Sequence, residues 1–271
     1  MFKRLSTFLR SGLKRVLGEI GFEPPPENAT SLLFGVGSEG EDIFLGSCFA
    51  YSSSRIFLPA THCIQGRTSS ALRVCGINEG TEDKLIQRVI THPTADLAVL
   101  ITDPSESGFD PFREILEVEP GDEVHAYGFH EDTTDHGIEP LDRHFHGVVQ
   151  RLFIWDIQRP YSYDAIELSF GAPPGLSGGP LYKSFVLPET GTHCFLVGMV
   201  TGNREASIHL ETITEVQNGN KHYVEHIHSV TNYGIALNLT AYTKWLTKIC
   251  KSVGRNKNRT TGSLPSSVTT A

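Results

Sequence analysis

Cysteine is scarce in this chain, and its spacing excludes the common thiolate sites. The 271 residues include five cysteines, Cys48, Cys63, Cys75, Cys194 and Cys250. None of them forms a CxxC pair, so neither a zinc ribbon nor a dithiol redox motif is expected. An odd number of cysteines in a chain of this length favours free thiols and a reducing compartment over a disulfide framework. A single Cys48–Cys63 bridge stays open, because the two residues flank one predicted hairpin.

Excess positive charge and long apolar runs are also missing. Lys and Arg number 23 against 31 Asp and Glu, which gives a formal net charge of −8. We expect no nucleic-acid partner, because binding to phosphates needs a basic surface. No apolar stretch reaches the length of a membrane span, and the basic N-terminal segment lacks the unbroken apolar region of a signal peptide. These absences predict a cytoplasmic protein.

Residues 1–20 carry apolar side chains at helical spacing with basic residues between them. This pattern predicts an amphipathic helix, which the prolines at 24–26 separate from the rest of the chain. Residues 1–30 are therefore expected to form an N-terminal extension. Packing of this helix on its own domain is the favoured interpretation, and contact with a membrane surface is the alternative.

Short apolar segments punctuated by Gly, Ser, Pro and Asn begin after residue 30, which is typical of an all-β protein. A Pro/Ser/Gly/Asp-rich connector at 103–114 divides them into two sets of six. The expected strands lie at 31–36, 42–51, 54–60, 71–75, 84–92 and 95–102, and then at 122–129, 145–156, 164–170, 179–183, 193–201 and 231–237. Two such sets predict two six-stranded antiparallel β-barrels, over residues 31–112 and 113–250.

The end of the second set and the remaining segments complete this organisation. Residues 238–250 place apolar side chains on one helical face, which predicts a C-terminal helix. Residues 251–271 are first basic and then rich in Ser and Thr, as in a disordered tail. The polar insertion at 203–230 alternates apolar and polar residues around an Asn-Gly-Asn turn, which predicts a hairpin.

Three segments carry residue types suited to nucleophilic catalysis. The segment IFLPATHC runs from an apolar strand to His62, and ADLAVL places Asp96 at the mouth of another strand. In GAPPGLSGGPL, Ser177 lies among glycines directly before a strand. His62 or Asp96 alone would be read as a structural residue. The serine segment is more specific, and the three together in this order indicate a His–Asp–Ser triad.

The chemistry of acyl transfer explains these residue types. A serine hydroxyl needs an imidazole to accept its proton, and the imidazole needs a carboxylate to orient it, roles that suit Ser177, His62 and Asp96. The tight turn at Gly175 allows the amides of Gly175 and Ser177 to form an oxyanion hole. Gly178 and Gly179 have no side chains that would obstruct a substrate.

These motifs resemble the active-site motifs of trypsin-like, chymotrypsin-fold serine peptidases, in particular the compact bacterial HtrA/Deg-like branch without a PDZ domain. Residues 121–128 resemble the first strand of that family's second barrel, and residues 196–201 resemble the strand that lines its substrate cleft. Residues 233–236 resemble its last strand. The likeness covers residues 31–250.

The resemblance implies a serine endopeptidase that acts on protein or peptide substrates and needs no cofactor. An acyl-enzyme would form on Ser177, with His62 as general base and then acid and Asp96 orienting it. The chain departs from the zymogen-activated enzymes at Leu176, where those enzymes carry the Asp that pairs with a new N-terminus. A catalytically silent, trypsin-like peptide-binding module is the alternative from another functional class.

By the family's spacing, Gly171 and Ala172 would form the base of the primary specificity pocket. Neither residue is charged, so a preference for Lys or Arg is not expected. Thr201, Gly202 and Asn203 would line one side of the cleft, where the substrate backbone pairs as an added strand. The resemblance therefore implies a medium-sized apolar residue before the scissile bond.

Histidines outside the triad fall into two groups. His125, His130, His136, His144 and His146 surround one expected loop, and His209, His222, His226 and His228 lie in the insertion. A metal or pH-sensing site is one interpretation, since alternate residues such as His226 and His228 share a face of a strand. Polar loop composition is the favoured one, because no carboxylate or cysteine completes a familiar ligand spacing. No metal site is therefore expected.

Overall fold

The computed structural model leaves both ends of the chain and several connecting segments outside the described structure. The described residues are 26–76, 83–103, 109–134, 137–156, 160–187, 191–217 and 220–256. The helix expected at 1–20, its suggested membrane contact and most of the expected tail lie outside them. None of the described helices is both long enough and apolar enough to cross a membrane.

The first barrel is a closed antiparallel sheet in the order β1-β2-β3-β6-β5-β4. Its strands are β1 (Thr30–Val36), β2 (Asp42–Tyr51), β3 (Ser53–Leu58), β4 (Leu72–Cys75), β5 (Lys84–Thr91) and β6 (Ala98–Thr102). Every residue of β6 is buried, as expected for a short apolar strand with no face in solvent. The pairing of β4 with β1 closes the barrel.

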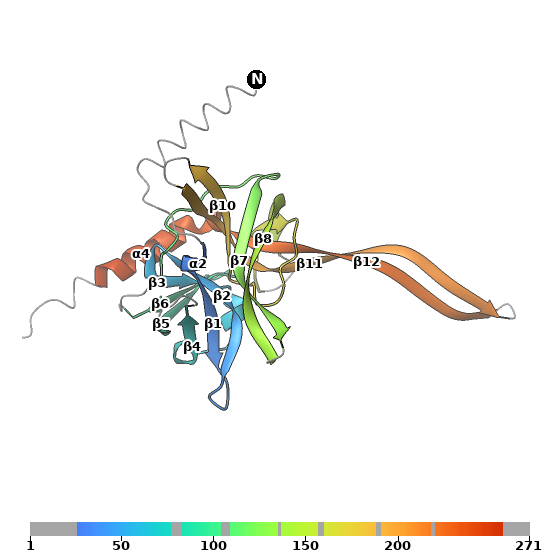
Figure 1. Cartoon of the computed structure of the whole chain (residues 1–271), viewed down its shortest axis with the longest axis horizontal. Helices are drawn as coiled ribbons and strands as arrows, with labels where there is room; N and C mark the ends of the chain where they lie inside the picture. Colours follow the sequence, from blue (N-terminus) through green and yellow to red (C-terminus); the bar gives the residue numbers. More distant parts are fainter. Residues whose placement is uncertain are drawn as a thin grey trace, which may run out of the picture.

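The second barrel is also closed, in the order β10-β11-β12-β9-β8-β7. Its strands are β7 (Glu123–Thr134), β8 (Gly137–Trp155), β9 (Tyr163–Leu168), β10 (Pro180–Leu187), β11 (Gly191–Gln217) and β12 (Asn220–Asn238). The predicted all-β fold of two six-stranded antiparallel barrels is confirmed (Figure 1).

The two barrels share one hydrophobic core at their interface. The largest buried cluster combines residues of both barrels with residues of the C-terminal segment. Phe112, in the connector, packs its ring 5.8 Å from that of Phe49 in β2 and 6.4 Å from that of Tyr182 in β10. Close packing of this kind fixes the position of one barrel relative to the other, so residues of different barrels can form a single site.

Short helices complete the chain. They are α2 (Pro26–Ala29), α3 (Thr61–Ile64), η1 (Ser69–Ala71), η2 (Leu239–Tyr242) and α4 (Thr243–Asn256). The C-terminal helix buries Leu246 and Ile249 in the interface cluster, as the apolar face at 238–250 predicts. It continues to Asn256 and so includes residues 251–256, which we expected to belong to the tail.

The β7–β8 hairpin is longer than the strands expected at 122–129 and 145–156. Its pairing continues to Thr134 and Gly137, so the loop expected to hold histidines is a hairpin. Polar residues on both faces hid these strands from a search for apolar alternation. Cross-strand contacts between polar side chains stabilise them instead, for example the Arg143–Asp132 ion pair at 2.9 Å. His136 lies outside the described residues.

The insertion at 203–230 forms the predicted hairpin and continues β11 and β12 without a break. The two strands remain paired from the barrel to Gln217 and Asn220 at the far end. Figure 1 shows this two-stranded arm extending away from the barrels. The cleft-lining residues expected at 201–203 lie where the arm leaves the second barrel.

Candidate active site

The first barrel supplies an imidazole and a carboxylate that are held together. His62 lies on the one-turn helix α3, directly after β3, and Asp96 lies in the turn between β5 and β6. Asp96 is only 4% exposed. One of its carboxylate oxygens is 2.6 Å from His62 Nδ1, and the other accepts a hydrogen bond of 2.9 Å from the His62 backbone amide. This arrangement fixes the ring and selects the tautomer that carries hydrogen on Nδ1.

A second histidine supports the turn that carries Asp96. His92 Nδ1 accepts hydrogen bonds from the backbone amides of Thr94 at 3.3 Å and Ala95 at 3.0 Å. Its ring lies 5.0 Å from the Trp245 ring of α4. Burial lowers the pKa of His92, which favours the neutral ring that these two bonds require. Sequence reasoning missed His92, because the bonds become visible only once the turn is folded.

The loop that carries Ser177 belongs to the second barrel and is held by the first. Gly175 and Gly178 have φ angles of +91° and +88°, which a residue with a side chain rarely adopts. Ser47 in β2 donates its hydroxyl to the Gly175 carbonyl and its backbone amide to the Ser177 carbonyl, both at 2.9 Å. The Ser47 hydroxyl also accepts a bond of 2.9 Å from the amide of Phe129. The sequence carries no signal for this role of Ser47.

Leu176 anchors the same loop through apolar packing. Its side chain is fully buried in the core of the second barrel. A Cβ placed on Gly128 would lie 2.8 Å from Leu176 Cδ1, and one on Gly179 would lie 3.3 Å from it. Glycine at these two positions therefore makes room for the leucine. Packing of Leu176 therefore holds this loop against the core of the second barrel.

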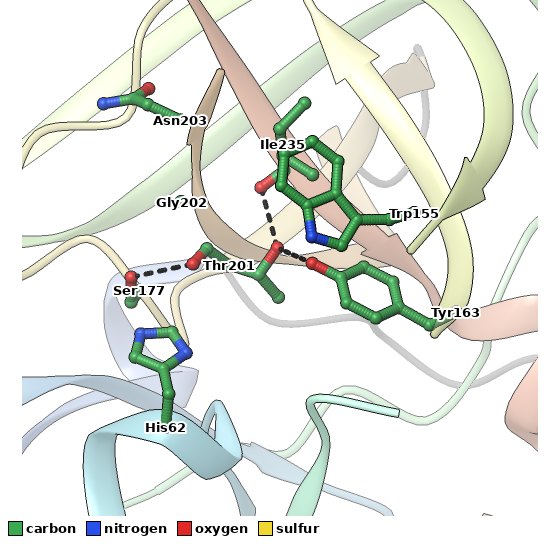
Figure 2. A pocket seen from close by; sticks show the side chains of 8 residues that line it. All are labelled: His62, Trp155, Tyr163, Ser177, Thr201, Gly202, Asn203 and Ile235. Carbon is green, nitrogen blue, oxygen red and sulfur yellow. Dashed lines mark hydrogen bonds between the residues drawn. The ribbon is translucent and has the colours of Figure 1, made fainter. Parts of the chain in front are cut away.

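Ser177 and His62 line one cavity of about 270 Å³ between the barrels (Figure 2). The Ser177 hydroxyl donates to the Thr201 carbonyl at 3.2 Å. Within the described part of the chain, it makes no hydrogen bond to His62, and the amides of Gly175 and Ser177 donate to no acceptor. Two backbone donors beside the hydroxyl are thus available to another acceptor.

The environment of His62 favours its charged form. Burial acts to lower the pKa of its ring, but hydrogen bonds with the side chains of Asp96 and Cys63 outweigh burial and raise the pKa from 6.5 to about 10. A protonated ring offers no acceptor on Nε2. The hydrogen bond from Ser177 to the Thr201 carbonyl fits this protonation state, because the hydroxyl then finds its acceptor elsewhere.

Comparison with known proteins identifies the fold. Neither a protein-family model nor a curated protein matches this sequence. Among solved structures, the MamO protease domain from Magnetospirillum magneticum is 18% identical with a TM-score of 0.52, over 80% of this chain and 95% of that one. The chain has the fold of trypsin-like, HtrA-type proteases. The expected family resemblance is thereby confirmed at the level of the fold.

Two further structures of this fold are similar to the same extent. The HtrA-type protease AlgW, solved with a decapeptide, is 17% identical with a TM-score of 0.51, over 84% of this chain and 65% of AlgW. The active form of the Rv3671c protease from M. tuberculosis is 15% identical with a TM-score of 0.52, over 83% of this chain and 82% of that one.

On this protease fold, a carboxamide bridges two walls of the expected specificity pocket. The Asn203 side chain accepts a hydrogen bond from the Ala172 amide and donates one to the Ala172 carbonyl. An added Cβ on Gly171 would lie 3.4 Å from Asn232 Cβ and 3.7 Å from Asn203 Oδ1. The structure therefore brings Gly171, Ala172 and Asn203 together and places Asn232 beside them, a neighbour that sequence reasoning missed.

The cavity has a second wall that was not expected. Thr201, Gly202 and Asn203 line one side, as the sequence predicts, and Trp155, Tyr163 and Ile235 also line it. Figure 2 shows the Thr201 hydroxyl bonded to the Ile235 carbonyl at 3.1 Å and to the Tyr163 hydroxyl at 3.0 Å. Aromatic residues at the ends of β8 and β9 were the available signal, but apolar strands commonly end in such residues.

Among the side chains that the structure describes, no group of three or more His, Cys, Asp and Glu could hold a metal ion. All five cysteines are free thiols, so Cys48 and Cys63 form no bridge.

Proposed function

We propose that the chain is a serine endopeptidase with Ser177, His62 and Asp96 as its catalytic triad. The observation that carries the proposal is the double hydrogen bond by which Asp96 holds the ring and the backbone of His62, in the cavity that Ser177 also lines. A nucleophile, a base and a group that orients the base are the parts that acyl transfer by serine requires.

In the proposed reaction, the Ser177 hydroxyl turns from Thr201 toward His62 and attacks the scissile carbonyl carbon as its proton passes to Nε2. The amides of Gly175 and Ser177 stabilise the oxyanion. His62 then donates the proton to the leaving amine, and an acyl-enzyme remains on Ser177. Water, deprotonated by His62, hydrolyses this ester and restores the free hydroxyl.

Substrate recognition would use both walls of the cleft. The substrate backbone would pair with β11 at Thr201, Gly202 and Asn203, as an added strand does. We propose an apolar residue of at most medium size before the scissile bond. The Asn203 bridge to Ala172 narrows the pocket, and neither of these residues carries a charge to attract Lys or Arg.

The alternative is a catalytically silent module that holds extended peptides. The hydrogen bond from Ser177 to the Thr201 carbonyl favours it, because the hydroxyl makes no contact with its base in this arrangement. The buried carboxylate behind His62 favours the peptidase, since a module that only binds peptides has no use for an oriented imidazole. Peptide cleavage distinguishes the two functions, because only the peptidase cleaves the peptide that it binds.

Incubation with a proteome-derived peptide library tests the proposal. We expect cleavage by the wild type, with Ala, Val or Leu enriched before the scissile bond, and no cleavage by Ser177→Ala. Mass spectrometry of the new termini measures both. Equal cleavage by the two proteins would contradict the proposed nucleophile, and enrichment of Lys or Arg would contradict the proposed pocket.

The pH dependence of activity should follow His62. Because its pKa is raised to about 10, the ring is protonated at neutral pH and can act as a base only as the pH rises. We expect kcat/KM for a peptide to increase with pH, with its midpoint above 6.5 and toward 10. The same shift contributes stability that is fully present below pH 6.5 and is lost as the pH passes about 10. Circular dichroism at each pH separates the two effects, and an activity midpoint at or below 6.5 would contradict this account.

A further inference from the structure

One buried polar group of the cavity wall, the indole N–H of Trp155, has no hydrogen-bond partner among the residues that the structure describes. Trp155 ends β8, lines the cavity together with His62 and Ser177, and is 4% exposed. A buried indole N–H usually finds an acceptor, because an unsatisfied buried donor costs free energy. An unpaired donor in the wall of a cavity therefore indicates that a ligand supplies the acceptor.

Tyr163, at the start of β9, supplies an acceptor on the same wall of the cavity. The Thr201 hydroxyl donates its hydrogen to the Ile235 carbonyl at 3.1 Å. The hydroxyl of Tyr163, 3.0 Å from that of Thr201, must therefore donate to it. Burial raises the pKa of Tyr163, so this hydroxyl is neutral near pH 7. Its oxygen keeps a lone pair that can accept a hydrogen bond from a ligand.

The charge of the cavity restricts the kind of ligand that fits these two groups. His62 is the charged residue among the described residues that line it, and the Asp96 carboxylate already pairs with its ring. The Asn203 carboxamide is engaged by the backbone of Ala172. A charged side chain would lose its water here without gaining a counter-charge. A carboxamide is neutral and has one acceptor oxygen and one NH₂ donor, so it matches both groups.

The position of these aromatic residues determines which substrate side chain reaches them. In the proposed peptidase, the substrate backbone pairs with β11 at residues 201–203. Figure 2 shows the Asn203 side chain, which borders the expected specificity pocket, pointing away from Trp155 and Tyr163. Successive side chains of an extended strand point to opposite faces. If the residue before the scissile bond faces the Asn203 side, the residue preceding it faces Trp155 and Tyr163.

We propose that Trp155 and Tyr163 form a second specificity subsite, which selects Gln as the second residue before the scissile bond. The Gln side-chain carbonyl accepts from the Trp155 N–H, and its NH₂ group donates to the Tyr163 oxygen. Both aromatic side chains are nearly fully buried, at 4% and 5% exposure, so Gln reaches them more readily than the shorter Asn. This inference rests on the proposed peptidase function and names a feature of its substrate.

Binding to Ser177→Ala tests the subsite without requiring catalysis. Three peptides carry Gln, Glu or Met as the second residue before the expected cleavage position and are otherwise identical. Glu has the shape of Gln but is charged, and Met has a similar length but no amide. We expect the Gln peptide to bind at least tenfold more tightly than either of the others, because they leave the Trp155 donor or the Tyr163 acceptor unpaired. Isothermal titration calorimetry measures the three affinities.

Two variants in the Ser177→Ala background remove one partner each. Trp155→Phe keeps an aromatic ring without the N–H, and Tyr163→Phe removes the acceptor. We expect each to reduce the preference for Gln over Met at least fivefold. Trp245→Phe is the matched control, because Trp245 lies on α4, outside the described lining of the cavity. It should keep the preference, and circular dichroism checks that all variants are folded.

The control variant also gives a second measurement. The chain has two tryptophans, so Trp155 is the remaining one in Trp245→Phe. Its fluorescence emission should shift when the Gln peptide binds, and shift less with the Met peptide.

The proposal is overturned if Ser177→Ala binds none of the peptides, binds Gln and Met peptides equally or prefers Glu. It is also overturned if folded Trp155→Phe keeps the full preference. A preference for Gln in Ser177→Ala, combined with no cleavage by the wild type, would contradict the peptidase function and support the subsite.

Discussion

Replacement of Asp96 by Asn should lower kcat/KM for peptide hydrolysis by about 10⁴-fold while the protein stays folded. Asp96 accepts two hydrogen bonds at once, from His62 Nδ1 at 2.6 Å and from the His62 backbone amide at 2.9 Å. The two donors meet different oxygens of the carboxylate, so each position must hold an acceptor. An Asn side chain in the same position has an oxygen at one of these places and an NH₂ group at the other, so it can accept from only one of the two donors.

The backbone amide decides which bond the Asn keeps. If its oxygen accepts from the amide, its NH₂ group faces Nδ1, which must then become an acceptor. The hydrogen of the neutral ring moves to Nε2, the atom that must accept the proton of Ser177, and general-base catalysis fails. If the Asn side chain turns over, its NH₂ group instead opposes the amide hydrogen of His62. In either orientation, Asn loses one of the two hydrogen bonds by which the carboxylate holds the ring and the backbone of His62.

Steady-state kinetics with a fluorogenic peptide, together with thermal unfolding, measures this effect. Asp110→Asn is the matched control, because Asp110 is an exposed carboxylate whose contact is a 3.4 Å hydrogen bond from Asn28. We expect this control to keep wild-type activity. An Asp96→Asn variant within tenfold of the wild type would show that the carboxylate has no catalytic role.

Gly178→Ala should lower kcat/KM by more than about 10²-fold and destabilise the fold, whereas Gly40→Ala should do neither to a comparable degree. Both glycines have φ of +88°. A Cβ on Gly178 would lie 1.9 Å from the Ser47 carbonyl oxygen and 2.9 Å from its carbonyl carbon, but a Cβ on Gly40 would meet nothing within 4 Å. The pair therefore separates the cost of the φ angle from the cost of the overlap.

The expected magnitudes follow from these two costs. A side chain in the left-handed region costs about 1–2 kcal/mol, and this should be the whole effect of Gly40→Ala. Overlap with backbone atoms adds about 1–3 kcal/mol at Gly178, because no side-chain rotation relieves it. The relief must come from movement of the Ser177 loop or of Ser47, and this movement should lower kcat/KM by more than about 10²-fold. Chemical denaturation and kinetics measure both quantities.

Equal unfolding free energies for Gly178→Ala and Gly40→Ala would show that the Ser177 loop is not held against Ser47. Full activity of Gly178→Ala would lead to the same conclusion. A loss of activity in Gly40→Ala comparable to that in Gly178→Ala would mean that the φ angle alone, and not the overlap, is responsible.

The fold was predictable because its signals are local. Apolar segments separated by turn residues mark most strands, and the fully buried β6 is an example. The β7–β8 hairpin was underestimated, because cross-strand polar pairs such as Arg143–Asp132 leave no apolar alternation in the sequence. The helical face at 238–250 was correctly placed, but helix ends depend on contacts that periodicity does not report.

The candidate triad residues could be found from the sequence, but the groups that support them could not. His62, Asp96 and Ser177 stand in short motifs, and the structure places them around one cavity or directly behind it. Their supporting groups stand in no motif. His92 and Ser47 act through backbone amides and carbonyls that approach them only in the folded chain. Side chains that support backbone leave no pattern of spacing, so sequence reasoning missed them.

The central claim is that Ser177 becomes a nucleophile through His62. Labelling with a fluorophosphonate probe, followed by peptide mapping, tests this most directly. The account predicts one adduct per chain, on the Ser177 hydroxyl, which forms faster as the pH rises and is absent in His62→Ala. No adduct on folded wild-type protein across the alkaline range, or an unchanged rate of labelling in His62→Ala, would contradict it.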